Sequence, residues 1–572
     1  MKRIYFIAAF ACVAGLGAWV AHGARASLDP NTVEINIVAL NDFHGHLEAS
    51  KFAPAKGAGG AAAAGGIDAL GAALQAWRKE DQGLLLIGAG DLVGASPALS
   101  NAWADEPSIV ALNLLGLRAS AVGNHELDHG LAELLRHQRG GCAASPKVAG
   151  ACQLDRQYGG ASFSYLAANI YEQATRRRVF PAYRVELVHG IKVGLIGAVL
   201  RDIGATIQPE NIAGLEFDDE AKAINQVLPE LRAQGVGVFI AMIHQGGYTR
   251  ARYDQQDCAD LDGEITEVVT RLDPAIRVVV SGHTHNGYLC KVAGRMVTQA
   301  EADGHMLTRI RLRVDKAANA VTGQHAENVL VEPGQYPPAP VLNAYLDRVR
   351  ERSAASLLQP AAKLAYAAVK RDPVPSGESP LGDLVADSML AAAQPLGAQI
   401  AFMNDGGLRR DLLSGKAQVS TVAQVRDVLP FGNRLVVMTL SGAQIRELLE
   451  QQWRGGAAAL RGILQVSDGF SYSWDSSTPE GRRVSPASIR LHGKPLDPSA
   501  AYRVVVNGFL AEGGDGYLMF TEGTQPAQAP VNDVDALLAY LRAQEKAGQP
   551  AGKQDAGERI RRSAGPAYSL DS

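Results

Sequence analysis

The feature that most constrains the fold of this chain is a repeated pattern in its first half, where short apolar runs end in polar clusters. The runs are rich in Val, Ile, Leu and Ala, a composition that predicts buried strands. Helix-like sequence at residues 67–78 and 108–115 alternates with them. The predicted strands are residues 33–40, 84–87, 119–122, 163–169, 192–199, 236–243 and 276–280. Because sites in α/β proteins form at the carboxyl ends of strands, the pattern predicts a layered α/β domain with one composite site.

The polar residues at the strand ends have side chains that suit a metal centre. They are Asp42, His44, Asp91, Asn124, His125, His244, His283 and His285. Imidazole, carboxylate and amide oxygen are ligands for Zn, Mn or Fe, and the absence of thiolates argues against a purely structural zinc site. Two metals about 3.5–4 Å apart that share a carboxylate would clamp a phosphoryl group and activate water. Asp91 is the best candidate for the shared ligand because it stands alone at its strand end.

The densest of these clusters, residues 123–130, has a simpler alternative interpretation. Eight polar residues after a strand also describe a solvated turn. The matching groups at the other strand ends favour the metal site.

Five motifs occur in an order that resembles the signature of the calcineurin-like metallophosphoesterases. They are Asp-x-His at 42–44, Gly-Asp at 90–91, Gly-Asn-His-Glu at 123–126, the lone His244, and Gly-His-x-His at 282–285. The resemblance implies a four-layer αββα domain. It also implies that Asp42, His44, Asp91 and His285 hold one divalent ion, and that Asp91, Asn124, His244 and His283 hold the other.

The resemblance also assigns a role to His125, which matches a histidine that faces the transferring phosphoryl and is not a ligand. Asp128, three residues on, would orient it and raise its basicity. His46 and His129 match no ligand of the family, and we expect surface or packing roles for both.

The N-terminus predicts export. Lys2-Arg3 precedes an apolar segment, and Ala24-Arg25-Ala26 forms a cleavage pattern, so residues 1–26 are predicted to be a signal peptide and Ser27 to begin the mature chain. An uncleaved anchor is the alternative. We expect a periplasmic or secreted protein with no stable membrane insertion after cleavage. Four cysteines remain, and sequence proximity favours the pairs Cys142–Cys152 and Cys258–Cys290 among three possible pairings. The formal net charge of −4 gives no electrostatic case for a nucleic acid polymer as partner.

A Pro-rich stretch at residues 333–340 marks a domain boundary. The predicted organisation is a signal peptide (1–26), a metallophosphoesterase domain (31–336), a linker helix (337–360), a second α/β domain (361–543) and a polar tail (544–572). Helices at residues 381–393 and 441–452 and strands at 435–439 and 502–506 are expected in the second domain.

Three stretches of the second domain resemble the 5'-nucleotidases. They are Asn-Asp-Gly-Gly-Leu-Arg at 404–409, Pro-Phe-Gly-Asn at 430–433, and the Gly-Gly-Asp-Gly loop at 513–516 with the preceding Phe509. The expected substrate-binding residues are Asn404, Arg409, Phe431, Phe509 and Asp515. The two Phe rings would sandwich a base, Asp515 would accept from ribose hydroxyls, Asn404 would read a base edge, and Arg409 would grip phosphate. The alternative for each Phe is a core position.

One departure from the family concerns phosphate binding. Relatives carry a further arginine a few residues before the segment that matches 378–382, where this chain has Pro373-Val374-Pro375-Ser376-Gly377. Phosphate binding rests on Arg409 alone, or Arg371 reaches in.

The expected function is therefore removal of the 5'-phosphate from nucleoside monophosphates by a metal-activated water, for nucleotide scavenging. Two divalent ions, Zn, Mn or similar, are the expected cofactors, and a nucleotide is the expected partner. A phosphodiesterase or pyrophosphatase acting on 2',3'-cyclic nucleotides, UDP-sugars or NAD would use the same motifs. A non-catalytic nucleotide-binding surface protein is the alternative from another class. Metal identity, base preference and oligomeric state stay open at this level.

Overall fold

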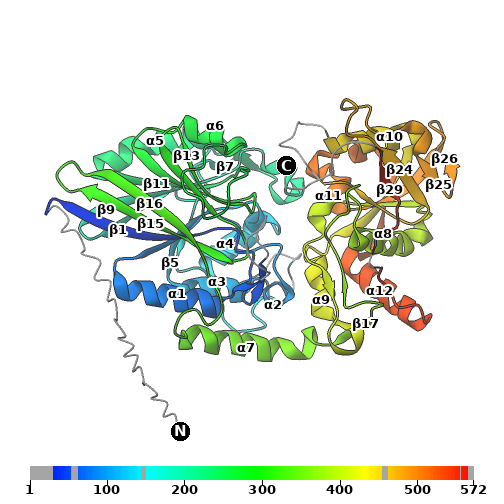
Figure 1. The fold of residues 1–572 in the computed structure, drawn as a ribbon, viewed down its shortest axis with the longest axis horizontal. Coiled ribbons are helices and arrows are strands. Elements are labelled where there is room, and N and C mark those ends of the chain that lie inside the picture. Colours follow the sequence, from blue (N-terminus) through cyan, green and yellow to red (C-terminus); the bar gives the residue numbers. More distant parts are fainter. Residues whose placement is uncertain are drawn as a thin grey trace, which may run out of the picture.

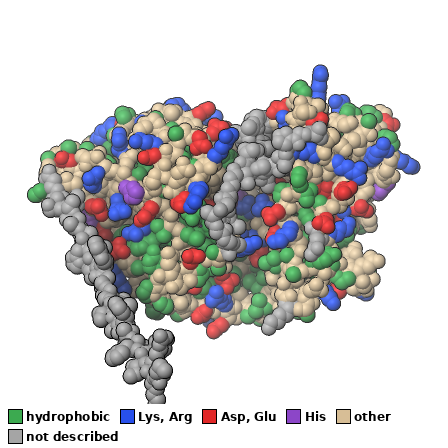
Figure 2. Space-filling view, in the orientation of Figure 1, with side chains coloured by type: hydrophobic (Ala, Val, Ile, Leu, Met, Phe, Trp, Pro, Cys, Tyr) green, Lys and Arg blue, Asp and Glu red, His purple; other side chains and the backbone are tan. Residues whose placement is uncertain are grey.

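The computed structural model of the protein describes residues 30–52, 62–143, 148, 150–453, 462–553 and 555–563. The predicted signal peptide lies outside these residues. Two domains, blue to green and yellow to red in Figure 1, are joined by helix α7 (Pro340–Leu357). Among the helices of the described ranges, none has the length and apolarity needed to cross a membrane. Acidic and basic side chains are interspersed over the face in Figure 2.

The N-terminal domain contains two six-stranded sheets. The first has the order β16 (Ala320–Leu330), β15 (Met306–Asp315), β1 (Thr32–Leu40), β4 (Leu85–Gly88), β5 (Leu117–Ala121), β6 (Ser164–Leu166). The second has the order β13 (Gly287–Val292), β14 (Arg295–Ala300), β12 (Ile276–Ser281), β11 (Val238–His244), β9 (Ile191–Val199), β8 (Tyr183–Val188). Strands β1, β4 and β5 are parallel, as are β9, β11 and β12, so within each set the carboxyl ends lie at one edge.

The period of two along each strand divides the core into layers. On β1, Ile35, Ile37 and Ala39 pack between the two sheets, whereas Val38 and Leu40 pack against helices. Helices α1 (Ile67–Glu80), α3 (Glu106–Leu115) and α7 cover the first sheet, and α5 (Glu220–Ala233) and α6 (Glu264–Thr270) cover the second. The predicted four-layer αββα arrangement is confirmed.

Helix α7 belongs to the outer layer of the N-terminal domain. Its Tyr345, Leu346 and Val349 join the same buried cluster as Trp77 of α1. The helix therefore extends from a packed position along this domain to the second one, as its course in Figure 1 illustrates.

The C-terminal domain is built on a five-stranded sheet. Its order is β23 (Gln465–Val466), β19 (Ile400–Met403), β27 (Ala501–Asn507), β22 (Arg434–Ser441), β28 (Thr524–Asn532). Helices α8 (Pro380–Ala393), α9 (Val422–Val428) and α12 (Asp533–Lys546) pack in one cluster, and α10 (Gly442–Glu450) packs in another with β24 (Phe470–Trp474). Shorter elements are α2 (Ala98–Asn101), α4 (Leu131–Arg139), α11 (Gly508–Ala511), β7 (Ile170–Glu172), β10 (Leu215–Phe217), β17 (Pro360–Lys363), β18 (Ala368–Val369), β20 (Leu412–Leu413), β21 (Val419–Thr421), β25 (Arg490–Leu491) and β26 (Lys494–Pro495).

Two strand pairings are not indicated by the composition of the sequence. The Ala/Gly-rich composition of residues 53–66 predicts a loop, but the end of this stretch forms β3 (Ala62–Gly65), which pairs with β2 (Ala49–Phe52); residues 53–61 lie outside the described ranges. The second lies within the predicted polar tail (544–572), where β29 (Ile560–Arg562) pairs with β24. Buried Arg559 fixes this segment through ion pairs to Asp387 at 2.7 Å.

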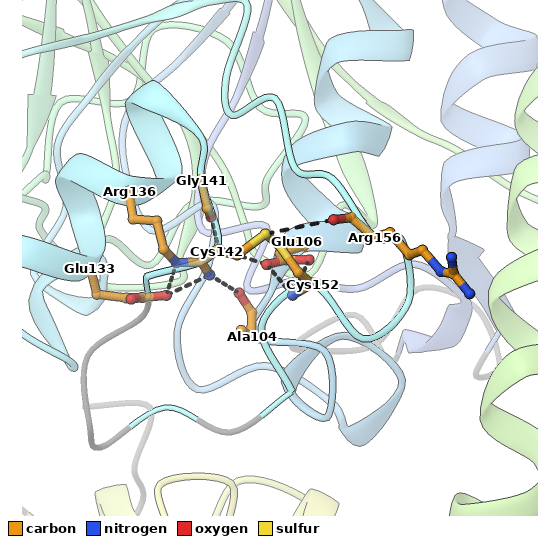
Figure 3. The surroundings of a disulfide bond; sticks show 8 residues. All are labelled: Ala104, Glu106, Glu133, Arg136, Gly141, Cys142, Cys152 and Arg156. Carbon is orange, nitrogen blue, oxygen red and sulfur yellow. Dashed lines mark hydrogen bonds and ion pairs between the residues drawn. A yellow bond between two sulfur atoms is a disulfide. The ribbon is translucent and has the colours of Figure 1, made fainter.

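The disulfides Cys142–Cys152 and Cys258–Cys290 are present, which confirms the favoured pairing. Figure 3 shows the first one beside a buried ion network. Glu106 accepts hydrogen bonds from the Cys152 N–H at 3.0 Å and from Arg136 at 2.6 Å, and Arg136 also pairs with Glu133. The disulfide therefore anchors its loop to α3 and α4.

Candidate active site between the two domains

The seven predicted metal ligands meet at one edge of the N-terminal sheets. Their positions follow β1, β4, β5 and β12 or, for His244, form the last residue of β11. Two groups have ligand atoms within 4.8 Å of one another: Asp42, His44 and His285, and Asp91, His244 and His283. The sheet topology explains the clustering, because parallel strands deliver their carboxyl ends to the same edge.

Asn124 and Asp91 connect the parts of this cluster. The Asn124 Oδ1 lies 3.0 Å from the Nε2 of His244 and 2.9 Å from the Nδ1 of His283. Asp91 Oδ2 lies 3.1 Å from His244 Nε2 and 3.8 Å from His44 Nε2. Asp91 thus reaches both groups, as a shared ligand must.

The loops that carry these side chains are held in strained backbone conformations. Asp42, His44, Asp91, His283 and His285 have φ between 46° and 74°, a region that non-glycine residues rarely adopt. Bonds between loops maintain it: His44 N–H donates to the Asp91 carbonyl at 2.9 Å, and His283 N–H donates to the Asp42 carboxylate at 3.0 Å. The absence of a side chain at Gly90 lets Gly123 and His244 pack closely against it, since a Cβ there would lie 2.7 Å from Gly123 N and from His244 Nδ1.

Glu126 organises the same loops. Its carboxylate accepts backbone N–H groups from Asp91 at 2.9 Å, Leu92 at 2.7 Å and Gly123 at 2.6 Å. Burial and, as a smaller contribution, the charge of the nearby Asp91 raise the pKa of Glu126 to about 7. Sequence reasoning assigns Glu126 no defined role, although it falls within the Gly-Asn-His-Glu motif.

The donor set fits divalent ions. His44 Nδ1 donates to the Gly94 carbonyl at 2.9 Å and His244 Nδ1 to the Ala89 carbonyl at 2.7 Å, which leaves each Nε2 as a lone-pair donor toward the cluster. His44 Nε2 faces His285 Nε2 at 3.0 Å, a pairing that a cation between the two would satisfy.

The pKa values of His44 and His283 agree with this fit, and that of His244 shows where the cluster attracts a positive charge. Burial lowers the pKa of His44 well below its ordinary value and that of His283 to about 4, so both rings are neutral, as ligation requires. At His244 burial also acts to lower the pKa, but the Asp91 carboxylate outweighs it and raises the value to about 9. The cluster therefore favours positive charge beside Asp91.

His125 and Asp128 form the predicted pair beside the cluster. The ring Nδ1 of His125 lies 2.9 Å and 3.0 Å from the two Asp128 carboxylate oxygens. The backbone N–H of His125 donates to Asp91 Oδ1 at 2.8 Å. Burial lowers the pKa of His125, but the Asp128 and Asp91 carboxylates outweigh burial and raise it overall. The two carboxylates thus favour the protonated form of this imidazole next to the cluster.

A cavity of about 610 Å³ links this edge to the C-terminal domain. The predicted site residues that line it are Asp91, Asn124, His125, Asp128, His283, His285, Asn404, Arg409, Phe431, Phe509 and Asp515. Asp42, His44 and His244 are fully buried behind its wall. His129 also lines the cavity, whereas His46 is buried against Asp303 and Arg410.

On the C-terminal side, the loops place the predicted substrate residues around the cavity. Asn404 Nδ2 donates to Asp515 at 2.8 Å, and its Oδ1 accepts from Asn507 at 2.9 Å, so its amide orients the Asp515 carboxylate. The Phe509 ring lies over Gly514, where a Cβ would collide with it. The predicted alternative that Phe431 and Phe509 are core residues is not met, since both are half-exposed and line the cavity.

The arginines divide between two sites. Arg409 lines the cavity, and burial, then the charge of Arg371, lowers its pKa. Arg371 lies 3.4 Å from Asp405 and is outside the cavity lining, which favours phosphate binding by Arg409 alone.

Sequence reasoning missed several polar residues around the cavity. Asn211 Nδ2 donates to the Asp128 carbonyl at 2.6 Å, Gln208 donates to Asn433 at 3.1 Å, and Asn101 donates to the Pro430 carbonyl at 2.9 Å. The hydrogen bonds of Gln208 and Asn101 connect the two domains. No motif marks these residues; Asn507 alone carries a signal, as the N-cap of α11 just before Phe509.

Comparisons with known proteins agree with the geometry. The calcineurin-like phosphoesterase family matches residues 35–287, and the 5'-nucleotidase C-terminal domain matches residues 360–522. The chain therefore belongs to the 5'-nucleotidase family of calcineurin-like phosphoesterases, and it is a metal-dependent phosphoric ester hydrolase.

Individual relatives cover the chain to different extents. The 5'-nucleotidase of Vibrio cholerae is 26% identical, over 95% of this chain and 96% of its own length. Endonuclease YhcR of Bacillus subtilis is 28% identical over 91% of this chain, which spans only 40% of that longer protein. The crystal structure of a 5'-nucleotidase precursor from Thermus thermophilus superposes with a TM-score of 0.73 and 26% identity, covering 93% of this chain and all of that one.

Proposed function

We propose that the protein is an exported dinuclear metallophosphohydrolase that removes the 5'-phosphate from nucleoside monophosphates, for nucleotide scavenging. One observation carries the proposal: a single cavity has two metal-binding groups in one wall and two aromatic rings with Asp515 in the other. The first wall suits a phosphate ester, and the second suits a nucleoside. The names of the Vibrio and Thermus relatives support the same substrate class.

The proposed ligands are Asp42, His44, Asp91 and His285 for one ion and Asp91, Asn124, His244 and His283 for the other. Divalent ions held there would polarise the phosphoryl oxygens and activate a water for attack on phosphorus. Zn and Mn both suit this donor set.

The chain's own groups supply the remaining chemistry. The raised pKa of His125 favours the protonated imidazole, whose Nε2 can donate to the charge that develops on the phosphoryl and leaving oxygens. Asp128 holds Nδ1 and fixes the ring. Arg409 grips the phosphate, Phe431 and Phe509 stack on the base, and Asp515, oriented by Asn404, accepts from ribose hydroxyls.

Export is part of the proposal. The signal-peptide pattern in residues 1–26 supports it, as do the two disulfides, since disulfides persist in oxidising compartments. The periplasm or the medium is the proposed location.

A second candidate is cleavage of phosphodiesters or pyrophosphates, such as 2',3'-cyclic nucleotides, UDP-sugars or NAD. The similarity to a relative named as an endonuclease favours it, because the same metal groups serve either ester. A non-catalytic nucleotide-binding role is disfavoured by the complete ligand set.

The test measures phosphate release from AMP and, by chromatography of the nucleotide products, cleavage of UDP-glucose, cyclic AMP isomers and NAD, with Mn or Zn supplied and with a chelator. The proposal predicts fastest release from AMP and its loss with the chelator. Faster cleavage of a diester or pyrophosphate would favour the second candidate. No release from any substrate would contradict the enzymatic function.

A further inference from the structure

The two domains meet through an aromatic contact at the reacting end of the cavity. The ring of Phe431, in the loop between α9 and β22, stacks on the imidazole of His125. The ring centroids are 5.8 Å apart and the planes differ by 20°. A residue expected to bind the base thus contacts the residue expected to act on the phosphate.

The loop that carries Phe431 is attached to the N-terminal domain on both sides of the ring. Before it, the Pro430 carbonyl accepts a hydrogen bond from Asn101 at 2.9 Å. After it, Asn433 accepts one from Gln208 at 3.1 Å. Because both donors come from the opposite domain, the position of the ring follows from domain docking.

Contacts within the N-terminal domain hold other parts of His125. Asp128 holds the Nδ1 edge, and the His44 ring meets it edge-on with a centroid distance of 5.2 Å. Asn211 in turn holds the Asp128 backbone at 2.6 Å. The Asp128 contact holds the Nδ1 edge of the imidazole, and the stacked ring of Phe431 adds a contact that opposes rotation about that edge.

We propose that Phe431 is a positioning residue for His125, in addition to its proposed contact with the base. The imidazole is then fully oriented only when the C-terminal domain is docked, which couples substrate enclosure to turnover. The inference rests on the proposed function to the extent that His125 acts in phosphoester hydrolysis. Aromatic pairs of this kind contribute an amount that corresponds to about a 2- to 10-fold change in rate.

The test compares Phe431→Leu with Phe431→Tyr and with Phe509→Leu. For AMP, Phe431→Leu should lower kcat about 3- to 10-fold, whereas Phe431→Tyr, which keeps the ring, should restore most of it. Phe509→Leu, which removes a ring without contact to His125, should act mainly on KM. With ribose 5-phosphate, which has no base, Phe431→Leu should still lower kcat/KM.

A double-mutant cycle provides the sharper readout. In a His125→Ala background, Phe431→Leu should leave the residual kcat nearly unchanged, because its effect acts through the imidazole. An equal loss of kcat in both backgrounds, or an effect of Phe431→Leu on KM alone, would overturn the inference.

A failure of this inference can be distinguished from a failure of the proposed function. If the wild type hydrolyses another phosphoester in preference to AMP, the proposed substrate is wrong, and the same variants are compared on the preferred ester. If no ester is hydrolysed, both proposals fail.

Discussion

The two walls of the cavity are built in different ways. The proposed metal-binding wall comes from five strand ends of one domain, and the proposed ligands Asp42, His44, Asp91, Asn124 and His244 are at most 1% exposed. The substrate wall consists of loops of the other domain, and its residues Phe431, Phe509 and Asp515 are half-buried. Contacts within one domain set the first wall, and contacts across the domain boundary help to set the second.

The two walls should therefore differ in how far they depend on docking of the two domains. The loops with left-handed backbone at His44 and Asp91 are retained because bonds among the strand ends over-determine them, whether or not the second domain is docked. The Phe431 loop is seated by Asn101 and Gln208 of the opposite domain. Changes on the first wall should therefore affect metal content and kcat. Changes on the second should affect KM and domain docking, except at Phe431, where the contact with His125 should also affect kcat.

The largest effect is expected for Asp91→Asn. Loss of the carboxylate that reaches both metal groups should lower turnover on the order of 10³-fold and reduce metal content, because several kcal/mol of charge stabilisation are removed. Mass spectrometry of bound metal and phosphate release measure the two effects. The matched control is Asp128→Asn, a carboxylate of the same cavity outside the ligand set, which should retain metal. Full metal content in Asp91→Asn would contradict the shared-ligand role.

Next in size is Arg409→Ala on the substrate wall. Loss of charge-assisted bonds to phosphate should reduce kcat/KM for AMP about 10- to 100-fold without loss of metal. Arg409→Lys should recover part of it, since charge remains and bidentate geometry is lost. Arg371→Ala is the comparison: an equal loss there would show that both arginines bind phosphate.

A smaller effect is expected at the interdomain cluster of His46, Asp303 and Arg410. Arg410 pairs with Asp303 at 2.5 Å and also contacts His46, so it joins the substrate wall to the loops next to Asp42 and His44. Arg410→Met should raise KM about 5-fold, because a partly exposed ion pair is worth about 1 kcal/mol.

Small-angle scattering should show a larger radius of gyration for Arg410→Met. The control is Arg348→Met, which breaks an exposed pair with Asp155 at 2.7 Å outside the cavity. Equal KM values for the two variants would show that this cluster does not contribute to domain docking.

The smallest effect on activity is expected for the double variant Cys142→Ser, Cys152→Ser. The bridge closes a loop with a sequence separation of 10, so its loss should reduce unfolding free energy by about 2–3 kcal/mol. Turnover should stay within about 2-fold of wild type, since the metal-binding wall has its own bonds. Urea denaturation and phosphate release check both, and a large loss of turnover would show that this wall is less independent than proposed.

The sequence is most informative where local order and topology coincide. The clustering of the proposed metal ligands could be predicted because each lies at or shortly after the end of a strand, and parallel strands bring their ends together. The β2–β3 pairing could not, because Ala62–Gly65 lacks the side chains that mark a strand. Burial of Arg559 was also unpredictable, since its partner Asp387 is distant in sequence.

Contacts between the two domains are the main feature of the site that the sequence does not predict. His46 has no motif partner nearby, and its role depends on Asp303 and Arg410, which docking alone brings together. The stacking of Phe431 on His125 has the same origin. Such contacts depend on how two separately folded surfaces fit, and hydrophobic periodicity within either domain carries no signal of it.

The most direct test of the account is to measure metal content and AMP turnover together in His125→Ala. We expect about two ions per chain in wild type and variant alike, with turnover lowered about 10²- to 10³-fold in the variant, because a proton-donating group is lost and the proposed ligands remain. A variant that loses bound metal, or one that keeps near-normal turnover, would contradict the division between metal ligands and His125 on which the proposed function rests.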